Sequence, residues 1–138
     1  MSSKKKMNIV LTGSSGQVGK EVNTLLAKKF NVYSFTRKEL DITDTQKVEE
    51  IISRLKPKYF INCAAYTKVD DCEINNELAF EINNLAVENI SKCLQPTGAI
   101  LIHFSTDYVF DGKSEIPYTE ADAVNPINIY GISKLKGE

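Results

Sequence analysis

The chain has 138 residues, of which 42% are hydrophobic and 25% are charged, and its formal net charge is −1 at pH 7. This composition is typical of one soluble globular domain. The near-neutral charge gives no electrostatic reason to expect nucleic acid or an anionic membrane as a partner. No apolar run has the length of a membrane span or of a signal-peptide core, so we expect a cytoplasmic protein.

Residues 1–6 and the three cysteines are expected to have no chemical role. The run Lys4-Lys5-Lys6 is predicted to belong to a solvated, flexible tail rather than to an anion-binding site. Cys63, Cys72 and Cys93 are odd in number, lack metal-ligand spacing and have only His103 as an imidazole partner. We therefore expect reduced cysteines that pack as small hydrophobic side chains, and no metal site.

Strand-like and helix-like segments alternate from residue 7 onward. Residues 7–12 are an apolar run of strand length that ends at glycines. A helical pattern begins at Gly16, with apolar side chains on one face at Val18, Val22, Leu25, Leu26 and Phe30. Residues 31–35 are predicted as the second strand.

The next helix is predicted from a capping pattern. Thr43 and Gln46 have capping-box spacing, and an amphipathic stripe follows at Val48, Ile51, Ile52 and Leu55. Pro57 ends this helix, and residues 59–61 are predicted as the third strand.

A longer helix is predicted over residues 74–94, with a buried stripe at Leu78, Ile82, Leu85, Ala86, Ile90 and Cys93. Pro96 and Gly98 end it. Residues 99–104 form a fourth strand, apolar enough to be buried on both faces. A polar loop then leads to a last helix that starts near Ile129.

This alternation predicts βαβ units, and therefore a parallel sheet with helices on both faces. We expect an α/β fold, a doubly wound parallel sheet of the Rossmann type over residues 7–138, with strand order 3-2-1-4. The ligand crevice would lie at the carboxyl ends of strands one and four.

The first motif, Gly13-Ser14-Ser15-Gly16-Gln17-Val18-Gly19, follows the first strand and opens the first helix. Glycines allow a phosphate to approach backbone N–H groups, and the helix N-terminus favours an anion. The spacing G-x-x-G-x-x-G differs from the usual dinucleotide fingerprint, and a tight turn that only packs helix on strand is the alternative. Its position after the first strand favours binding of a pyrophosphate.

The second strand ends at Phe35-Thr36-Arg37-Lys38, where the fingerprint expects an acid for the ribose 2′-hydroxyl. Arg37 could instead bind a 2′-phosphate through parallel N–H bonds. A solvated basic turn explains the same residues equally well. On this pattern NADP(H) is favoured as cofactor, with NAD(H) as the alternative.

Tyr130-Gly131-Ile132-Ser133-Lys134 places a phenol and an ammonium four residues apart, on one face of a helix. A nearby positive charge lowers the pKa of a phenol, which suits proton transfer at a carbonyl. Ser105-Thr106-Asp107-Tyr108 follows the fourth strand, where a hydroxyl can orient the substrate oxygen. An exposed helical pair and a polar strand terminus are the structural alternatives.

Together these motifs resemble the short-chain dehydrogenase/reductases. The stretches 62–70 (N-C-A-A-Y-T-K-V-D), 105–112 (S-T-D-Y-V-F-D-G) and 126–135 look like the dTDP-4-dehydrorhamnose reductases, and the second is the most specific. The resemblance covers nearly the whole chain after the tail. It implies NADPH-dependent reduction of a dTDP-4-keto-6-deoxysugar, dTDP-4-dehydrorhamnose to dTDP-rhamnose, in the biosynthesis of cell-surface polysaccharides.

The resemblance also implies roles for individual residues. Tyr130 would donate the proton, Lys134 would lower the pKa of Tyr130 and bond the nicotinamide ribose, and Thr106 would orient the substrate. The remaining cofactor contacts would come from Gly13, Gly16, Gln17, Val18 and Gly19 at the pyrophosphate, Asp41 and Ile42 at the adenine, and Ala65, Tyr66 and Thr67. Thr106, Asp107 and Val69 would contact the dTDP-sugar substrate.

Two departures from related enzymes limit these expectations. Sugar-nucleotide 4,6-dehydratases carry an Asp-Glu pair where this chain has Asp107-Tyr108, which favours reduction over dehydration. Family members continue into a substrate domain after the last helix, whereas this sequence stops at Gly137-Glu138, so we expect an incomplete domain that is inactive alone.

Two other functions stay open. One is a non-catalytic NADP-binding regulatory subunit resembling the β subunit of methionine adenosyltransferase, and the other is an inactive truncated remnant. The expected partner is a dTDP-sugar, with neither nucleic acid nor membrane, and a homo-oligomer stays open.

Overall fold

The computed structural model describes residues 6–138, which divide into two compact units. The first unit contains residues 6–64 and 88–104, and the second contains residues 65–87 and 105–138. Most of the expected flexible tail, including Lys4 and Lys5, lies outside the described residues.

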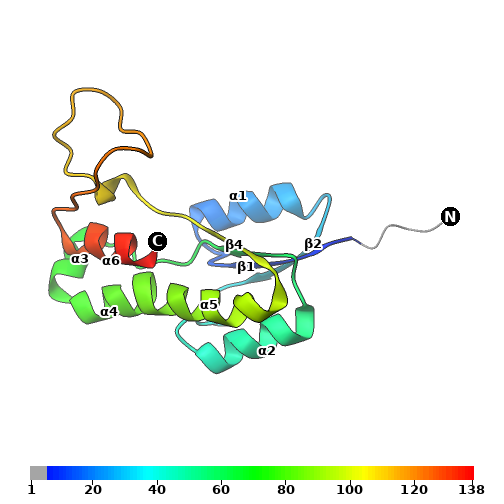
Figure 1. Cartoon of the computed structure of the whole chain (residues 1–138). Coiled ribbons are helices and arrows are strands. Elements are labelled where there is room, and N and C mark those ends of the chain that lie inside the picture. The colour runs from blue at the N-terminus through cyan, green and yellow to red at the C-terminus, as the bar shows by residue number, and fades with distance from the viewer. Residues whose placement is uncertain (1–5) are drawn as a thin grey trace. The chain divides into compact units, whose positions relative to one another are not determined.

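The first unit is built on a four-stranded parallel sheet (Figure 1). Its strands are β1 (Asn8–Thr12), β2 (Asn31–Phe35), β3 (Tyr59–Asn62) and β4 (Ile100–His103). All three strand pairs are parallel, β1 with β2, β1 with β3, and β3 with β4. The expected α/β class and the four expected strands are confirmed.

The strand order, however, is β2-β1-β3-β4 and not the expected 3-2-1-4. The third strand pairs with β1 on the side opposite β2. Phe60 and Ile61 of β3 are buried at 0% and 5% exposure, so this strand gains most from neighbours on both edges. The less buried β2 occupies the edge. Strands are therefore added on one side of β1 first and on its other side from β3 onward. In such a sheet the ligand crevice is expected at the carboxyl ends of β1 and β3, where this reversal occurs.

Helices cover both faces of this sheet. Figure 1 shows α1 (Gln17–Leu26) on one face and α2 (Thr45–Leu55) on the other. Three apolar residues of the first predicted stripe, Val22, Leu26 and Phe30, pack against Ile9, Leu11 and Ile61 of the sheet. Val18 and Leu25 were predicted on the same face but are 50% and 63% exposed, because the buried stripe of α1 is narrower than the pattern suggested.

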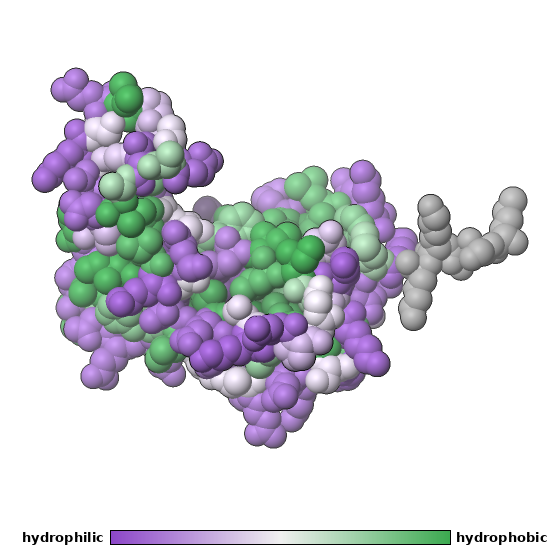
Figure 2. All heavy atoms as spheres, in the orientation of Figure 1, coloured by the Kyte–Doolittle hydropathy of each residue, from purple (hydrophilic) through white to green (hydrophobic). Residues whose placement is uncertain are grey.

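Two further local predictions are wrong. Asp44, and not Thr43, caps α2, because its carboxylate accepts the N–H of Lys47 at 3.0 Å. β4 is not buried on both faces, since Ile100 and Ile102 are 47% and 40% exposed on an edge strand. Figure 2 shows a hydrophobic patch over the region that Figure 1 labels β4.

The second unit is mostly helical. It contains α3 (Val69–Ile74), α4 (Asn76–Phe80), a π-helical turn η1 (Glu81–Leu85), a 3₁₀ turn η3 (Asp107–Val109) and α6 (Ile129–Gly137). Helix α5 (Ala86–Leu94) begins in this unit and continues in the first unit, where the 3₁₀ turn η2 (Gln95–Thr97) follows it. A long loop precedes α6 and exposes Ile116, Val124 and Ile127.

The single helix predicted over residues 74–94 is therefore wrong. Its first part is divided between α3 and α4, and the π-turn inserts extra residues per turn before α5. Each inserted residue rotates the following side chains by about 100° around the helix. Leu85, predicted in the buried stripe, is 51% exposed, whereas Asn83 is fully buried.

A buried amide joins three strands at the carboxyl end of the sheet. Oδ1 of Asn62 accepts the hydroxyl of Thr12 at 2.8 Å and the N–H of Ala64 at 3.1 Å. Nδ2 of Asn62 lies 3.2 Å from Nδ1 of His103. Asn62 is 1% exposed, so these partners cannot be replaced by bulk water without opening the sheet.

We expect Asn62→Ala to lower the free energy of unfolding by about 2–4 kcal/mol, because the buried hydroxyl of Thr12 and the partly buried N–H of Ala64 lose their acceptor. Urea unfolding followed by circular dichroism measures this loss. Asn31→Ala removes an exposed amide from β2 and is the control, with an expected change within about 0.5 kcal/mol. A loss below 1 kcal/mol for Asn62→Ala would show that the amide does not join the strands energetically.

Candidate functional site

In the first unit, the glycine loop lies directly against the segment that follows β3. Gly13 has a φ of +70°, and a Cβ built there would lie 2.5 Å from the backbone N of Ala64 and from the backbone C of Cys63. A Cβ on Gly19 would overlap the carbonyl oxygen of Gly13. Only glycine fits these two positions, so the loop and the start of α1 form one close-packed backbone structure.

The start of α1 has the properties of an anion site. Its N-cap is Gly16, and no side chain caps the helix. The first N–H groups of a helix have no intrahelical acceptor, and the helix dipole adds positive potential there. Gly16, Gln17 and Val18 are exposed, so their backbone can be reached from solvent. Such a helix start is suited to an anion, and pyrophosphate binding by these residues stays a prediction.

A cavity of about 580 Å³ lies beside this loop in the first unit. Its lining residues come from the glycine loop and from the segment after β2: Ser15, Thr36, Arg37, Lys38 and Asp41. The two segments are joined where the N–H of Ser14 donates to the carbonyl oxygen of Phe35 at 3.1 Å. The sequence left phosphate binding and a solvated turn as equally good explanations of Arg37. The side chain of Arg37 lines this cavity and is also 68% exposed, which is compatible with both.

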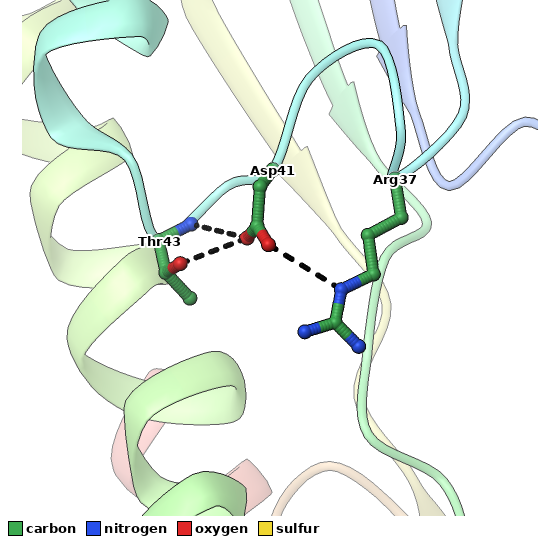
Figure 3. A network of polar contacts seen from close by, with 3 residues as sticks. All are labelled: Arg37, Asp41 and Thr43. Carbon is green, nitrogen blue, oxygen red and sulfur yellow. Dashed lines mark hydrogen bonds and ion pairs between the residues drawn. The ribbon is translucent and has the colours of Figure 1, made fainter.

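An acid lies in the same cavity, although the sequence pattern placed none at the end of the second strand. Oδ1 of Asp41 accepts the N–H and the hydroxyl of Thr43 at 3.0 and 2.8 Å, and Oδ2 accepts Nε–H of Arg37 at 3.3 Å (Figure 3). Burial acts to raise the pKa of Asp41, but the bonds from Thr43 and the charge of Arg37 outweigh it and lower the pKa. Asp41 is therefore an anion at neutral pH. The adjacent Ile42 is in the core at 4% exposure.

In the second unit, α6 presents the Tyr-x-x-x-Lys motif. Oδ1 of Asn128 caps the helix by accepting the N–H of Gly131 at 2.7 Å, and Glu73 accepts the N–H of Ile129 at 2.8 Å. A Cβ on Gly131 would overlap the carbonyl oxygen of Tyr108. The glycine inside the motif therefore lets α6 pack closely on the turn η3.

Tyr130 and Lys134 are both buried on α6, at 9% and 2% exposure, so the alternative of an exposed helical pair is wrong. Burial raises the pKa of Tyr130, and a hydrogen bond with the side chain of Thr106 opposes that rise. This direction is opposite to the lowering expected from Lys134. Lys134 is itself desolvated, and burial lowers its pKa to about 8 while the charge of Glu138 opposes that change.

The predicted substrate residues of this unit surround Tyr130. Thr106 caps η3 by accepting the N–H of Tyr108 at 3.2 Å, and its hydroxyl donates to Asp107 at 3.3 Å. The ring of Tyr108 meets that of Tyr130 edge-on, with centroids 5.5 Å apart. Val69 packs against the cluster that contains Tyr130.

The predicted cofactor residues of this unit differ in exposure. Tyr66 packs against the cluster that contains Tyr130, and Ala65 is half-buried. Thr67 is exposed. Of these three residues, Thr67 is therefore the most accessible.

Asn83 is the residue that the sequence analysis missed. From the π-turn, its Oδ1 accepts the N–H of Tyr66 at 2.8 Å, and its Nδ2 donates to the carbonyl oxygen of Tyr66 and to the hydroxyl of Ser133, each at 3.0 Å. Ser133 in turn donates to the carbonyl oxygen of Tyr130 at 2.8 Å. The buried amide of Asn83 thus joins the segment at Tyr66 to α6, the helix that carries Tyr130 and Lys134. The available signal was two asparagines beside an apolar stripe in a predicted helix.

The loop before α6 is held by Asp111. Its carboxylate accepts the N–H of Lys113, the hydroxyl of Tyr118 and the amide of Asn125 at 2.9–3.2 Å. Tyr118 stacks on Phe110 with centroids 4.3 Å apart. A second cavity of about 290 Å³ lies next to this stack and includes Asp107 in its lining.

The three cysteines, metal-type clusters and long apolar helices can be described for residues 6–138. Cys63, Cys72 and Cys93 are free, and burial is the main cause that raises the pKa of each thiol. The described residues contain no group of His, Cys, Asp and Glu side chains arranged to hold a metal ion. None of their helices is long and apolar enough to cross a membrane.

Several known proteins are similar to this chain in both sequence and fold. dTDP-4-dehydrorhamnose reductase of Salmonella typhimurium strain LT2 is 43% identical over 136 residues, which cover 96% of this chain and 46% of that protein. The crystal structure of dTDP-4-dehydrorhamnose reductase from Bacillus anthracis strain Ames in complex with NADP is 40% identical, with a TM-score of 0.94 over 99% of this chain and 49% of that one. The corresponding structure from Clostridium acetobutylicum is 42% identical, with a TM-score of 0.91 over 95% of this chain and 47% of that one.

The chain therefore spans about half the length of the curated relatives that it matches. The family model described as RmlD substrate binding domain matches residues 7–138. Because that match covers nearly all of the sequence, the chain belongs to the dTDP-4-dehydrorhamnose reductase (RmlD) family and corresponds to the N-terminal portion of its members.

Proposed function

We propose that this chain is the cofactor-binding portion of an NADP(H)-dependent reductase of a dTDP-4-keto-6-deoxysugar, with dTDP-4-dehydrorhamnose as substrate. The observation that carries the proposal is the buried Tyr130, whose pKa the nearby side chain of Thr106 influences, with Lys134 buried on the same helix. The substrate follows from the names of the relatives, and NADP is the cofactor named for the B. anthracis structure.

The first unit supplies groups suited to the phosphates of the cofactor. Backbone N–H groups at the start of α1 would bind the pyrophosphate, with Gly13 and Gly19 allowing the loop to close on itself. Arg37 and Lys38 line the adjacent cavity, where they would bind the 2′-phosphate. When bound, the reduced cofactor supplies the hydride for the carbonyl carbon.

The second unit supplies the proton. A raised pKa keeps Tyr130 protonated at neutral pH, which a proton donor to the carbonyl oxygen requires. The hydroxyl of Thr106 would bond the same oxygen and hold it near the phenol. With a pKa of about 8, Lys134 is mostly charged at pH 7 and would stabilise the phenolate left after proton transfer.

Reduction fits this site better than dehydration or a purely regulatory role. Tyr108, in the position of the dehydratase glutamate, packs its ring roughly perpendicular to that of Tyr130 and offers no carboxylate as base. A regulatory subunit that only binds NADP could use Lys134 at the ribose but would have no use for a buried, protonated phenol. The burial of Tyr130 is therefore the feature that favours catalysis.

The cost of burying the charged Lys134 depends on pH in a defined direction. The pKa of Lys134 is lowered from 10.5 to about 8 in the folded chain, so between these values the unfolded chain binds more protons. Folding stability therefore falls as the pH decreases from 10.5 to 8, and the full cost is present below pH 8. At 1.36 kcal/mol per pKa unit the upper limit of this cost is about 3 kcal/mol.

Lys134→Met keeps the apolar stem and removes the charge. Relative to the parent chain, its free energy of unfolding should be higher at pH 7 by about 1–3 kcal/mol, and this gain should disappear by pH 10.5. Urea unfolding at both pH values measures the difference. Lys136→Met, an exposed lysine of the same helix, is the control and should show no such change with pH. A gain that is equal at both pH values would contradict the assigned cause.

Tyr130→Phe tests the proton donor in a protein extended to the length of the relatives. Loss of the hydroxyl should lower kcat by roughly 10²–10⁴-fold, the usual range for general acid catalysis, with little change in cofactor affinity. Single-turnover loss of reduced nicotinamide absorbance measures the step. Tyr108→Phe keeps the contact with Tyr130 and should retain the parental rate. Near-parental transfer in Tyr130→Phe would leave a cofactor-binding role without catalysis as the better account.

A further inference from the structure

The cavity at the end of β2 contains charges of opposite sign, and these have opposite effects on a bound phosphate. Arg37 and Lys38 attract a phosphate, whereas the carboxylate of Asp41 repels it. We propose that Asp41 is a specificity-determining residue, which limits the preference of this cavity for an adenine nucleotide with a 2′-phosphate over one without it. This inference rests on the proposed cofactor site.

The position of Asp41 is fixed independently of Arg37. Oδ1 accepts two hydrogen bonds from Thr43, one from the backbone and one from the side chain, which leaves Oδ2 directed to the guanidinium (Figure 3). Because Thr43 holds the carboxylate, Asp41 would keep its place when a ligand draws the flexible Arg37 away. The negative charge of Asp41 therefore remains in the cavity whether or not a ligand is bound.

The bond to Arg37 leaves most of the guanidinium available. Among the described residues, Arg37 bonds Asp41 through Nε alone, at 3.3 Å. Figure 3 shows the two terminal nitrogens directed away from the carboxylate. These nitrogens are the edge of a guanidinium that binds phosphate through parallel hydrogen bonds. A phosphate and Asp41 can therefore share Arg37, with the two anions on different edges of it.

The magnitudes decide the direction of the effect. If two like unit charges are taken as about 6 Å apart in water, their repulsion weakens binding by roughly three-fold. A phosphate carries about 1.5–2 charges. The repulsion is then roughly five- to ten-fold. Holding Arg37 in place offsets part of this, but an exposed ion pair contributes only about one- to five-fold. Repulsion therefore outweighs positioning, and Asp41 reduces the selectivity for the phosphate.

The test compares two probes that need only this cavity and the adjacent loop, adenosine 2′,5′-bisphosphate and adenosine 5′-monophosphate. Calorimetric titration of the whole chain gives the dissociation constant of each, and their ratio is the selectivity. Any contact of Asp41 with the adenine or the ribose contributes equally to both probes and cancels in the ratio. Activity does not enter the measurement.

Asp41→Asn keeps the shape and still accepts the bonds from Thr43, while the negative charge is lost. We expect its selectivity for the bisphosphate to rise by about three- to ten-fold over the parent chain, and this rise to shrink at high salt. Arg37→Gln should change the ratio in the opposite direction. Asp41→Ser, a smaller acceptor, replaces Asp41→Asn if circular dichroism shows that the amide variant is unfolded.

Glu39→Gln is the matched control. Glu39 is an exposed acid in the same turn, but it accepts the N–H and the hydroxyl of Thr36, both at 2.7 Å, and does not line the cavity. Its loss of charge should leave the ratio within about two-fold of the parent, since Glu39 lies outside the lining of the cavity and solvent screens its charge.

The outcomes separate this inference from the proposed function. If both probes bind and the ratio is unchanged or falls in Asp41→Asn, the role of Asp41 is overturned while the cofactor site stands. If Glu39→Gln raises the ratio equally, the effect is one of net charge, and the role of Asp41 is likewise overturned. If the parent chain binds neither probe, the cofactor site itself is overturned together with this inference.

Discussion

Backbone packing at the carboxyl ends of β1 and β3 is the constraint on which the first unit depends. Gly13 lies so close to the backbone of Cys63 and Ala64 that any side chain would collide, and Gly19 lies equally close to Gly13. Because β3 pairs directly with β1, the segment after β3 forms one wall of the loop. The loop is thereby fixed in shape before any ligand binds, and the N–H groups at the start of α1 are exposed in a fixed arrangement.

In the second unit the same principle works through buried polar groups. Asn83 joins the Tyr66 segment to Ser133, and Ser133 joins it to the backbone of Tyr130. Every donor and acceptor of the amide side chain has a partner, so the network can be buried at little cost. Burial of the charged Lys134 on the same helix lowers its pKa and is costly. Stability is thus lost at a group that the proposed chemistry uses, which is where such losses concentrate in enzymes.

The two units also differ in how charge is placed. Around Tyr130, burial dominates and keeps the phenol protonated. In the cavity beside the glycine loop the side chains are exposed, and solvent weakens every interaction between Arg37 and Asp41. A deeply buried ion pair there would select strongly between the nucleotide with a 2′-phosphate and the one without it. An exposed pair would instead allow a graded preference, in keeping with the proposed binding of NADP(H), with NAD(H) as the alternative.

The sequence by itself determined the α/β class, the four strands, the glycine loop and the pairing of Tyr130 with Lys134 on one helix. These features depend on residues a few positions apart, whose periodicity and turn chemistry are local. The tertiary structure alone decided that β3 lies beside β1, because strand neighbours depend on the burial of Phe60 and Ile61 rather than on chain order. It also placed Asp41 in the cavity with Arg37, turned Asn83 inward at a π-turn, and set the direction of the pKa shift of Tyr130. The cavity forms where the segment after β2 meets the distant glycine loop, and desolvation or contacts between distant segments cause the other two, so no local pattern in the chain encodes them.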